Sequence, residues 1–369
     1  MTGYSTDVSP LTHWARRAPA LALVAMVAAG CSDDPTDPGN GDGPEAHEVG
    51  AVVNSGEQTL TVFGVDDPDD AVSVDLAPDG TPVDLSARGD RAVVPLGTLN
   101  AVAVVDLRGR VRLETVSLPE GSGATGSAFL SDSEALVANP NLDTVSRIDL
   151  DAGSVVDAVE VGRYPGGLLV HQDRIFVANA MLDDQFVPAE EGTLTVLDAE
   201  DLSEVGTVEL SGLNPGNLAA GADGEVYVLN SGQFGEANGS LSVVDPGSLE
   251  EVAHHEGFGD FPGSLAVGPD GNVHMGSYSF GVSVWDPGSE SFVHGPDDAV
   301  EPGGIPSVAG VGFDSDGRFH AVIPEMPGDG GGEEPGAVLR LEATTYEVEE
   351  EVPAGISAVG VAFSEFDEL

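Results

Sequence analysis

Two loop-like stretches of the sequence carry acidic side chains whose chemistry suits a metal ion. One contains Asp183 and Asp184, and the other contains Glu333 and Glu334. Carboxylate oxygens are the ligands that Ca²⁺ and other hard divalent cations prefer. These four residues are therefore candidate ligands for a divalent cation. The alternative is that they are solvated acids on a protein rich in them, in which case no cofactor is expected.

A second group of polar and aromatic residues recurs at equivalent places between apolar segments. Asparagines end several of these segments, namely Asn54, Asn139, Asn179 and Asn230. Other candidates stand just before a proline that opens an apolar segment, namely Tyr164, Asn214 and Phe261, and Arg163 precedes Tyr164. A side-chain amide at the end of a strand either contacts a ligand or caps the backbone of its own loop. The set is a candidate binding surface for a protein or a small molecule.

The patterns of common catalytic sites are absent from the sequence. It contains no Gly-x-Ser-x-Gly elbow and no Gly-rich phosphate loop. The stretch 314–317 (Asp-Ser-Asp-Gly) lacks the partner ligands of a calcium loop, so we predict a tight turn there. The adjacent pair His254 and His255 falls on an expected outer strand, where solvated histidines are usual. We therefore expect a protein without catalysis of its own rather than an enzyme.

The N-terminal segment has the composition of an export signal. Arg16 and Arg17 precede an apolar run of roughly 12 residues, which is shorter than the ~20 that a membrane-spanning helix needs. The run ends in Ala-Ala-Gly followed by Cys31, the single cysteine of the chain. This ending resembles the lipobox of bacterial lipoproteins. The resemblance implies a signal peptide over 1–30 and a lipid on Cys31; the alternative is an ordinary signal peptide with an incidental cysteine.

The segment 31–48 separates the signal from the rest of the chain. Proline and glycine alternate with aspartate in it, and it has too few large apolar residues to form a core. We predict an extended acidic tether.

Charge excludes nucleic acid as a partner. The 369 residues include 64 acidic and 12 basic side chains, a formal net charge of −52, and every basic residue is arginine. Phosphate binding needs clustered basic side chains, which are missing here. Disorder is not expected beyond the tether, because 41% of the residues are hydrophobic and they alternate along the chain.

The elements that position the candidate residues repeat with a period of about 40–50 residues, which is typical of propeller blades. Each unit has an opening Pro or Gly, a short apolar strand, a tight turn, a strand often ending in Asn, and two further strands. The C-terminal piece is a first strand without a continuation, and the piece after residue 49 lacks a first strand. We predict an all-β fold over 49–369, a seven-bladed propeller of four-stranded blades. Its ring is closed by the C-terminal strand joining the N-terminal blade.

The repeat also resembles a known family. Val-Asn-Ser-Gly, Val-Ala-Asn-Pro and Val-Leu-Asn-Ser-Gly, followed by strands such as Thr-Leu-Thr-Val-Leu-Asp, are similar to the YVTN-type β-propeller repeat. In three blades Pro95, Ser277 and Pro324 replace the strand-ending Asn. The family is known mostly as secreted or surface proteins of unassigned function, so the resemblance implies a fold and an exported location.

These observations predict a monomeric binding or scaffold module. It would be lipid-anchored in the cell envelope, in the outer membrane facing the periplasm or at the cell surface. The alternative is a hydrolase that resembles gluconolactonases, with a divalent ion held over the central channel by amides such as Asn139, Asn179 and Asn230.

Overall fold

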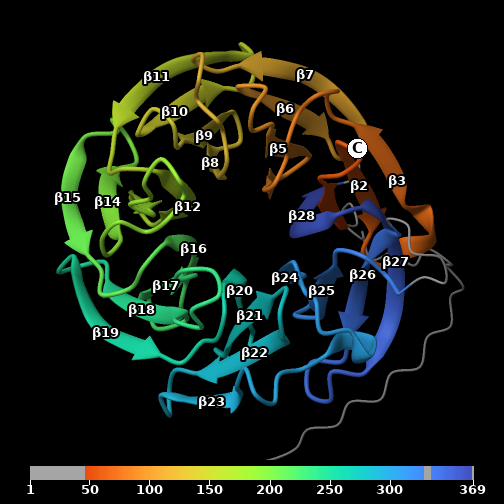
Figure 1. Cartoon of the computed structure of the whole chain (residues 1–369). Coiled ribbons are helices and arrows are strands. Elements are labelled where there is room, and N and C mark those ends of the chain that lie inside the picture. Colours follow the sequence, from red (N-terminus) through yellow and green to blue (C-terminus); the bar gives the residue numbers. More distant parts are fainter. Residues whose placement is uncertain (1–45, 328–333, 368–369) are drawn as a thin grey trace, which may run out of the picture. The chain divides into compact units, whose positions relative to one another are not determined.

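The structure is a computed structural model, and it describes residues 46–327 and 334–367. Cys31, the signal segment, most of the tether and Glu333 lie outside the described residues. Seven four-stranded antiparallel sheets succeed one another around a central channel (Figure 1), which confirms the predicted seven-bladed propeller. We number the blades in chain order, and blade 1 is the one that combines both ends of the chain. Within the described parts, no helix is long and apolar enough to cross a membrane.

Each blade is a sheet of four strands that succeed one another from the channel outward. Blade 1 contains β28 (Ala358–Asp367), β1 (Ala46–Asn54), β2 (Thr59–Gly64) and β3 (Val72–Asp75); blade 2 contains β4 (Ser86–Arg88), β5 (Arg91–Pro95), β6 (Ala101–Asp106) and β7 (Val111–Ser117); blade 3 contains β8 (Ser127–Ser131), β9 (Glu134–Asn139), β10 (Thr144–Asp149) and β11 (Ser154–Glu160); blade 4 contains β12 (Pro165–His171), β13 (Arg174–Asn179), β14 (Thr193–Asp198) and β15 (Glu204–Glu209). Blade 5 contains β16 (Pro215–Ala220), β17 (Val226–Asn230), β18 (Ser240–Asp245) and β19 (Glu250–Glu256); blade 6 contains β20 (Pro262–Val267), β21 (Val273–Ser277), β22 (Gly281–Asp286) and β23 (Ser291–His294); blade 7 contains β24 (Gly310–Phe313), β25 (Phe319–Ile323), β26 (Pro335–Leu341) and β27 (Val348–Ile356). Two short 3₁₀ turns, Pro68–Asp70 and Pro302–Gly304, lie in loops.

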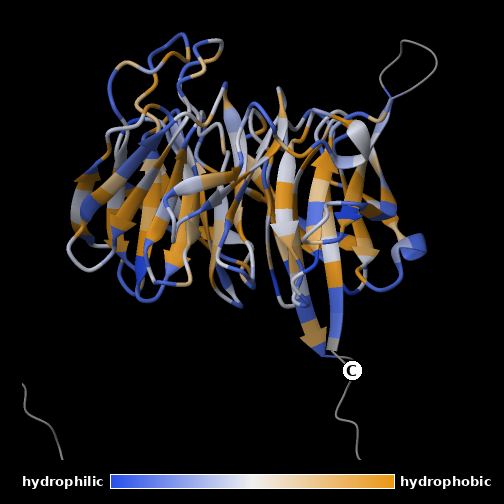
Figure 2. Cartoon of the chain, turned by 90° about the horizontal axis from the view of Figure 1, so that it is seen from below, coloured by the Kyte–Doolittle hydropathy of each residue, from blue (hydrophilic) through white to orange (hydrophobic). Residues whose placement is uncertain are grey.

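The core lies between the blades rather than in one central mass. The middle strands are almost wholly buried, as in β14, where five consecutive residues have no more than slight exposure. Each hydrophobic cluster of the described residues combines two neighbouring blades; one joins Phe176 of blade 4 to Val228 of blade 5, for example. Apolar bands therefore run along the strands (Figure 2). Both faces of each middle strand are covered, because every sheet has a neighbour on either side.

The ring closes as the sequence predicts. Strand β28 pairs antiparallel with β1 from Ala46↔Asp367 to Asn54↔Ala358, with one register shift. Strand β1 begins at residue 46, three residues before the expected start of the propeller, and β28 extends to Asp367. Both strand ends project from the face opposite the long loops (Figure 2). Closure supplies the inner neighbour of β1 and completes blade 1 as a four-stranded sheet like the others.

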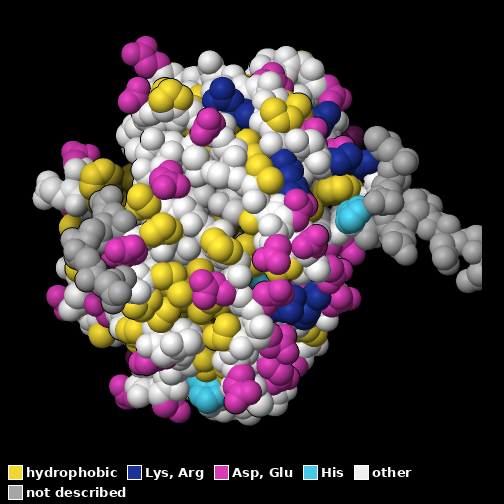
Figure 3. Space-filling model, turned by 90° about the vertical axis from the view of Figure 1, so that its right-hand side faces the viewer, with side chains coloured by type: hydrophobic (Ala, Val, Ile, Leu, Met, Phe, Trp, Pro, Cys, Tyr) yellow, Lys and Arg dark blue, Asp and Glu magenta, His cyan; other side chains and the backbone are white. Residues whose placement is uncertain are grey.

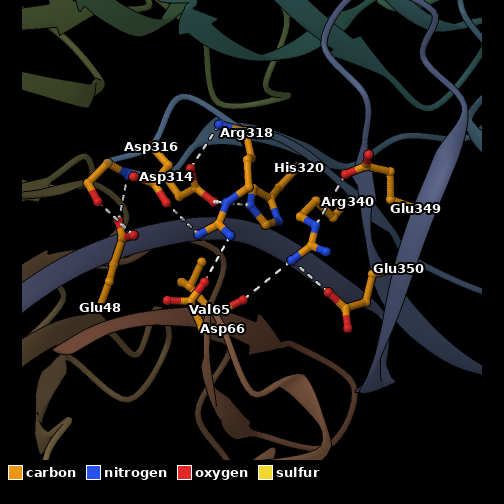
Figure 4. Close-up of polar contacts among 11 residues, drawn as sticks. Glu48, Val65, Asp66, Asp314, Asp316, Arg318, His320, Arg340, Glu349 and Glu350 are labelled. Atoms are coloured by element: carbon orange, nitrogen blue, oxygen red, sulfur yellow. Dashed lines mark hydrogen bonds and ion pairs between the residues drawn. The ribbon is translucent and has the colours of Figure 1, made fainter.

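A polar network on that lower face fastens blade 7 to blade 1 (Figure 4). The buried Asp314 carboxylate accepts hydrogen bonds from Arg318 Nε at 2.6 Å and from His320 Nε2 at 2.9 Å. Arg318 Nη1 reaches Asp66 at 2.9 Å, and Glu48 accepts from the backbone and hydroxyl of Ser315.

The network also lowers the pKa of Asp314. Burial alone would raise the pKa of Asp314, but the hydrogen bonds from His320 and Arg318 outweigh it and lower that pKa. The same residues form the tight turn expected at 314–317, in which Gly317 has a φ of 77°.

Candidate functional site

The four strand-ending asparagines are buried inside their blades. Each amide nitrogen donates to two hydroxyl groups on the adjacent third strand. The pairs are Asn54 with Thr59 and Thr61, Asn139 with Thr144 and Ser146, Asn179 with Thr193 and Thr195, and Asn230 with Ser240 and Ser242. All four are 0% exposed. The amides therefore join the second strand to the third, a different arrangement from the expected cap on the loop backbone.

The packing around these amides explains a glycine at the exit of the preceding blade. A Cβ at Gly212 would lie 2.2 Å from the amide of Asn230, and one at Gly162 would lie 2.5 Å from that of Asn179. Glycine is required at both places because any side chain would displace the asparagine. In blades 4 and 5 the Asn and the Gly thus pack as one structural unit.

The loops between second and third strands define what we call the top face. Arg163 and Tyr164 support the longest described one, the loop of blade 4. Arg163 donates to the carbonyl of Met181 at 2.7 Å and lies 3.7 Å from Glu190. Tyr164 adopts a left-handed φ of 57°, and its ring meets that of Phe186 edge to face at 5.8 Å. These two candidates hold the loop in place.

Asn214 and Phe261 take the same left-handed backbone, with φ of 55° and 51°. Asn214 Nδ2 donates to the carbonyl of Gly232 in the loop of its own blade, at 3.3 Å. The Phe261 ring is 36% exposed and packs edge to face on Phe234 at 5.8 Å. The sequence thus brings an aromatic pair to the top of blade 4 and another to blades 5 and 6.

The loops of the top face also carry a series of exposed apolar side chains. Blades 2 to 6 each expose at least one large apolar residue in the loop between second and third strands, and blade 4 also exposes Val187 (37%). The most exposed residues, one from each blade, form a set. They are Leu99 (38% exposed), Leu142 (39%), Phe186 (65%), Phe234 (76%) and Tyr278 (49%). We call this set the apolar arc. Large apolar groups exposed at corresponding places on adjoining loops mark interaction surfaces.

The acidic candidates do not come together. Asp183 and Asp184 lie on blade 4, whereas Glu334 lies on blade 7, three blades further around the ring. Asp183 accepts the backbone N–H groups of Val187 and Gln185, which lowers its pKa and fixes the turn of its own loop. Among the residues that the structure describes, no group of three or more His, Cys, Asp or Glu is placed to hold a metal ion.

A cavity of about 440 Å³ occupies the central channel. Residues of all seven blades line it, most of them glycines or other small residues. Inner strands approach one another closely here: a Cβ at Gly126 would lie 2.0 Å from the carbonyl oxygen of Gly166. Tyr278 of the apolar arc also lines the cavity, so the arc and the channel are continuous.

Asp84 is a functional candidate that the sequence patterns above do not single out. It lines the channel cavity just before β4, half-buried, and one carboxylate oxygen accepts the backbone N–H of Ser127 at 3.0 Å. Burial raises the pKa of Asp84 to about 6, although the Ser127 hydrogen bond opposes the shift. A signal was available, since Asp84 occupies in Pro-Val-Asp-Leu the place that Gly167, Asn217 and Ser264 take in Pro-Gly-x-Leu.

Comparisons with known proteins address the fold. No protein-family model and no curated protein matches the chain. Among solved structures, hydrazine synthase of Kuenenia stuttgartiensis is similar with a TM-score of 0.62 and 15% identity, over 78% of this chain and 90% of that one. The WD40 β-propeller domain of Doa1 has a TM-score of 0.56 and 14% identity, over 73% of this chain and 84% of that one. Streptogramin B lyase has a TM-score of 0.56 and 10% identity, over 72% of this chain and 84% of that one. At these identities the likeness shows that the chain shares their β-propeller fold.

Proposed function

We propose that this protein is a lipid-anchored binding module of the cell envelope, a propeller of the YVTN type that takes its ligand on the top face. The apolar arc carries the proposal, because five successive blades expose a large apolar side chain on the top face and one of them, Tyr278, also lines the channel cavity. Rigid blades with exposed loops are suited to recognition, and a fold alone prescribes no reaction.

The direction of β1 supports an anchor on the N-terminal side. The strand runs from Ala46 at the lower face to Asn54 at the top. A tether joined at residue 46 therefore enters from the face opposite the apolar arc. A lipid on Cys31 would hold the propeller by its lower side and leave the top face accessible.

The anchor is tested by changing Cys31→Ala in the full chain and fractionating the producing cells. The unchanged protein should partition with membranes, and the variant should be soluble or remain as an uncleaved precursor. Processing and membrane association that are the same in both would contradict the lipid anchor.

The binding face is tested with the double variant Phe186→Ser/Phe234→Ser. Its control is Val205→Ser/Val252→Ser, which removes two exposed apolar side chains (44% and 50% exposed) from outer strands, away from the top face. Thermal melting is measured against a panel of peptides, sugars, lipids and amines. Ligands that stabilise the unchanged protein and the control, but not the top-face variant, support the proposal. A panel in which every stabilising ligand acts equally on both variants contradicts it.

A further inference from the structure

Among the residues that the structure describes, Asp84 has no basic partner and is the one charged residue that lines its cavity. The other residues that line the channel cavity are glycines, small polar residues, aliphatic residues and Tyr278. Neighbouring arginines are engaged elsewhere: Arg88 pairs with Asp132 at 2.6 Å and Arg91 with Asp151 at 2.8 Å. A half-buried carboxylate whose charge is not compensated attracts a cation, because leaving it unpaired at low dielectric is costly.

The cavity suits an organic cation better than a metal ion. Calcium takes six to eight oxygen ligands, usually with several carboxylates, and Mg²⁺ demands near-ideal octahedral geometry. Within 46–327 and 334–367, Asp84 is the one acidic residue that lines this cavity. A volume of about 440 Å³ falls in the range of small-molecule sites. A primary ammonium group needs one carboxylate and a few neutral acceptors, and its apolar part can extend toward the mouth.

The mouth and the overall charge fit the same ligand. Tyr278 is 49% exposed at the mouth, where its ring offers a face to an apolar or cationic group. The net charge of −52 raises the local concentration of cations around the whole propeller. Both features favour a small amine with an apolar substituent.

We propose that the upper part of the central channel binds a small organic ammonium ion, with Asp84 as its counter-ion and Tyr278 at its apolar end. This inference deepens the proposed function and rests on it, since it names the ligand class for the face where the apolar arc lies.

The competing explanation is that Asp84 joins blade 2 to blade 3 through Ser127. Asp84→Asn separates the two, because the amide oxygen can still accept the Ser127 N–H while the charge is lost. The matched control is Glu120→Gln, which removes one negative charge at an exposed position after β7.

The probes are benzylammonium and its neutral analogue benzyl alcohol, with CaCl₂ at matched ionic strength. Calorimetric titration of the purified full-length protein at pH 8 should show benzylammonium binding that Asp84→Asn weakens at least about tenfold and Glu120→Gln leaves unchanged. Benzyl alcohol should bind the three proteins alike. The proposal is overturned if Asp84→Asn binds benzylammonium as well as the unchanged protein, or if neither binds below ~10 mM. A CaCl₂ response that Asp84→Asn abolishes would overturn it in favour of a metal site.

A pH profile gives a second measurement. Binding needs the ionised carboxylate, so affinity for benzylammonium should fall about tenfold between pH 7 and pH 5, as the Asp84 carboxyl, with its pKa of about 6, takes up a proton. Tyr278, the other titratable group of the cavity, is neutral over this range because the ordinary pKa of tyrosine is near 10 and burial raises it further. Asp84→Asn should show a flat profile. An equal slope in the variant would contradict the assignment to Asp84.

The outcomes of the two proposals can be told apart. If the Phe186→Ser/Phe234→Ser variant still binds every ligand but Asp84→Asn loses benzylammonium, the channel site stands and the role of the arc fails. If the arc variant loses ligands that Asp84→Asn retains, the binding face stands and the ammonium site fails.

Discussion

The backbone N–H of Gly355 donates a hydrogen bond of 2.8 Å to Oδ1 of Asn54, across 301 residues of sequence. Asn54 also donates to Thr59 and Thr61, so one amide joins two strands of blade 1 and the exit of blade 7. A Cβ at Gly355 would lie 2.8 Å from the Asn54 side chain. The amide that joins the second and third strands elsewhere thus acts here as part of the closure as well.

We expect Asn54→Ala to destabilise the protein more than Asn139→Ala does. Both lose two hydrogen bonds to hydroxyls, but only Asn54→Ala also leaves the N–H of Gly355 without its acceptor, whereas Oδ1 of Asn139 has no partner among the described residues. An orphaned donor costs about 1–3 kcal/mol when it is fully buried, and Gly355 is half-buried, so we expect a difference of up to about 1 kcal/mol. Urea unfolding of both variants measures the difference in free energy of unfolding. Equal losses would contradict a role for Asn54 in closure.

Deletion of β28 should destabilise or aggregate the protein. A chain that ends at Ile356 leaves β1 with an open edge over nine residue pairs and exposes Ala51 and Val53, which are fully buried. Melting and light scattering are compared with a chain that lacks only 368–369. If the two chains melt alike and stay equally soluble, closure by the C-terminal strand does not matter for stability.

Acid should destabilise the protein through His274. Burial lowers its pKa from 6.5 to about 4, and Phe313, Phe319 and Tyr346 surround its ring. The unfolded chain binds a proton at the higher pKa. The neutral, buried His274 therefore contributes to the free energy of unfolding above pH ~6.5, and this contribution is lost as the pH falls toward 4. The loss amounts to about 3 kcal/mol. Urea unfolding at pH 7 and pH 4.5 should show a smaller drop for His274→Phe than for the unchanged protein. An identical drop would show that His274 does not contribute.

Asp84→Asn should stabilise the protein without ligand at neutral pH. The pKa of Asp84 is raised from 3.8 to about 6 in the folded state. The protonated side chain therefore contributes to the free energy of unfolding below pH ~4, and this contribution is lost as the pH rises through 6. Removing the ionisable group avoids a loss of about 2–3 kcal/mol in the free energy of unfolding. The variant should gain stability at pH 8 and match the unchanged protein near pH 4. A gain of the same size at both pH values would assign it to packing instead.

Salt should raise the melting temperature. On the side shown in Figure 3, acidic side chains are spread over the surface and outnumber the arginines, and the full chain carries a net charge of −52. Their repulsion disfavours the compact state, and the Debye length falls from about 8 Å at physiological ionic strength to about 3 Å at 1 M. Melting in low salt, in molar NaCl and in millimolar CaCl₂ tests this. A constant midpoint would show that the charge is too dispersed to matter, and a rise peculiar to calcium would indicate a metal site.

The fold could be predicted because the repeat appears many times in the sequence. A Pro or Gly opening, a tight turn and a strand that often ends in Asn recur from blade to blade and fix the phase of the repeat, and the split blade fixes the closure. The start of β1 at Ala46 could not be predicted, since its first residues look like the tether and become a strand by pairing with Ser364–Asp367.

The candidate site was less predictable. A signal for the asparagines was present in the alternating hydroxyls that follow them, as in Thr193-x-Thr195, but strand pairing was needed to see that the amide reaches across. Asp84 is one acid among many, and its place in the channel emerges once all seven inner strands surround it. Exposure of Phe186 and Phe234 depends on loop conformation, which apolar periodicity does not encode.

The pairing of Ala46 with Asp367 sets the order in which the protein can be completed. The first strand to leave a ribosome or a translocation pore must wait for the last, because its inner neighbour is the end of the chain. Contacts of such long sequence separation form slowly, so blades 2 to 7 are expected to assemble while β1 still lacks its partner. During this interval the inner edge of β1 is open to other chains. Delivery of the final ten-residue strand therefore ends the aggregation-prone stage of biogenesis.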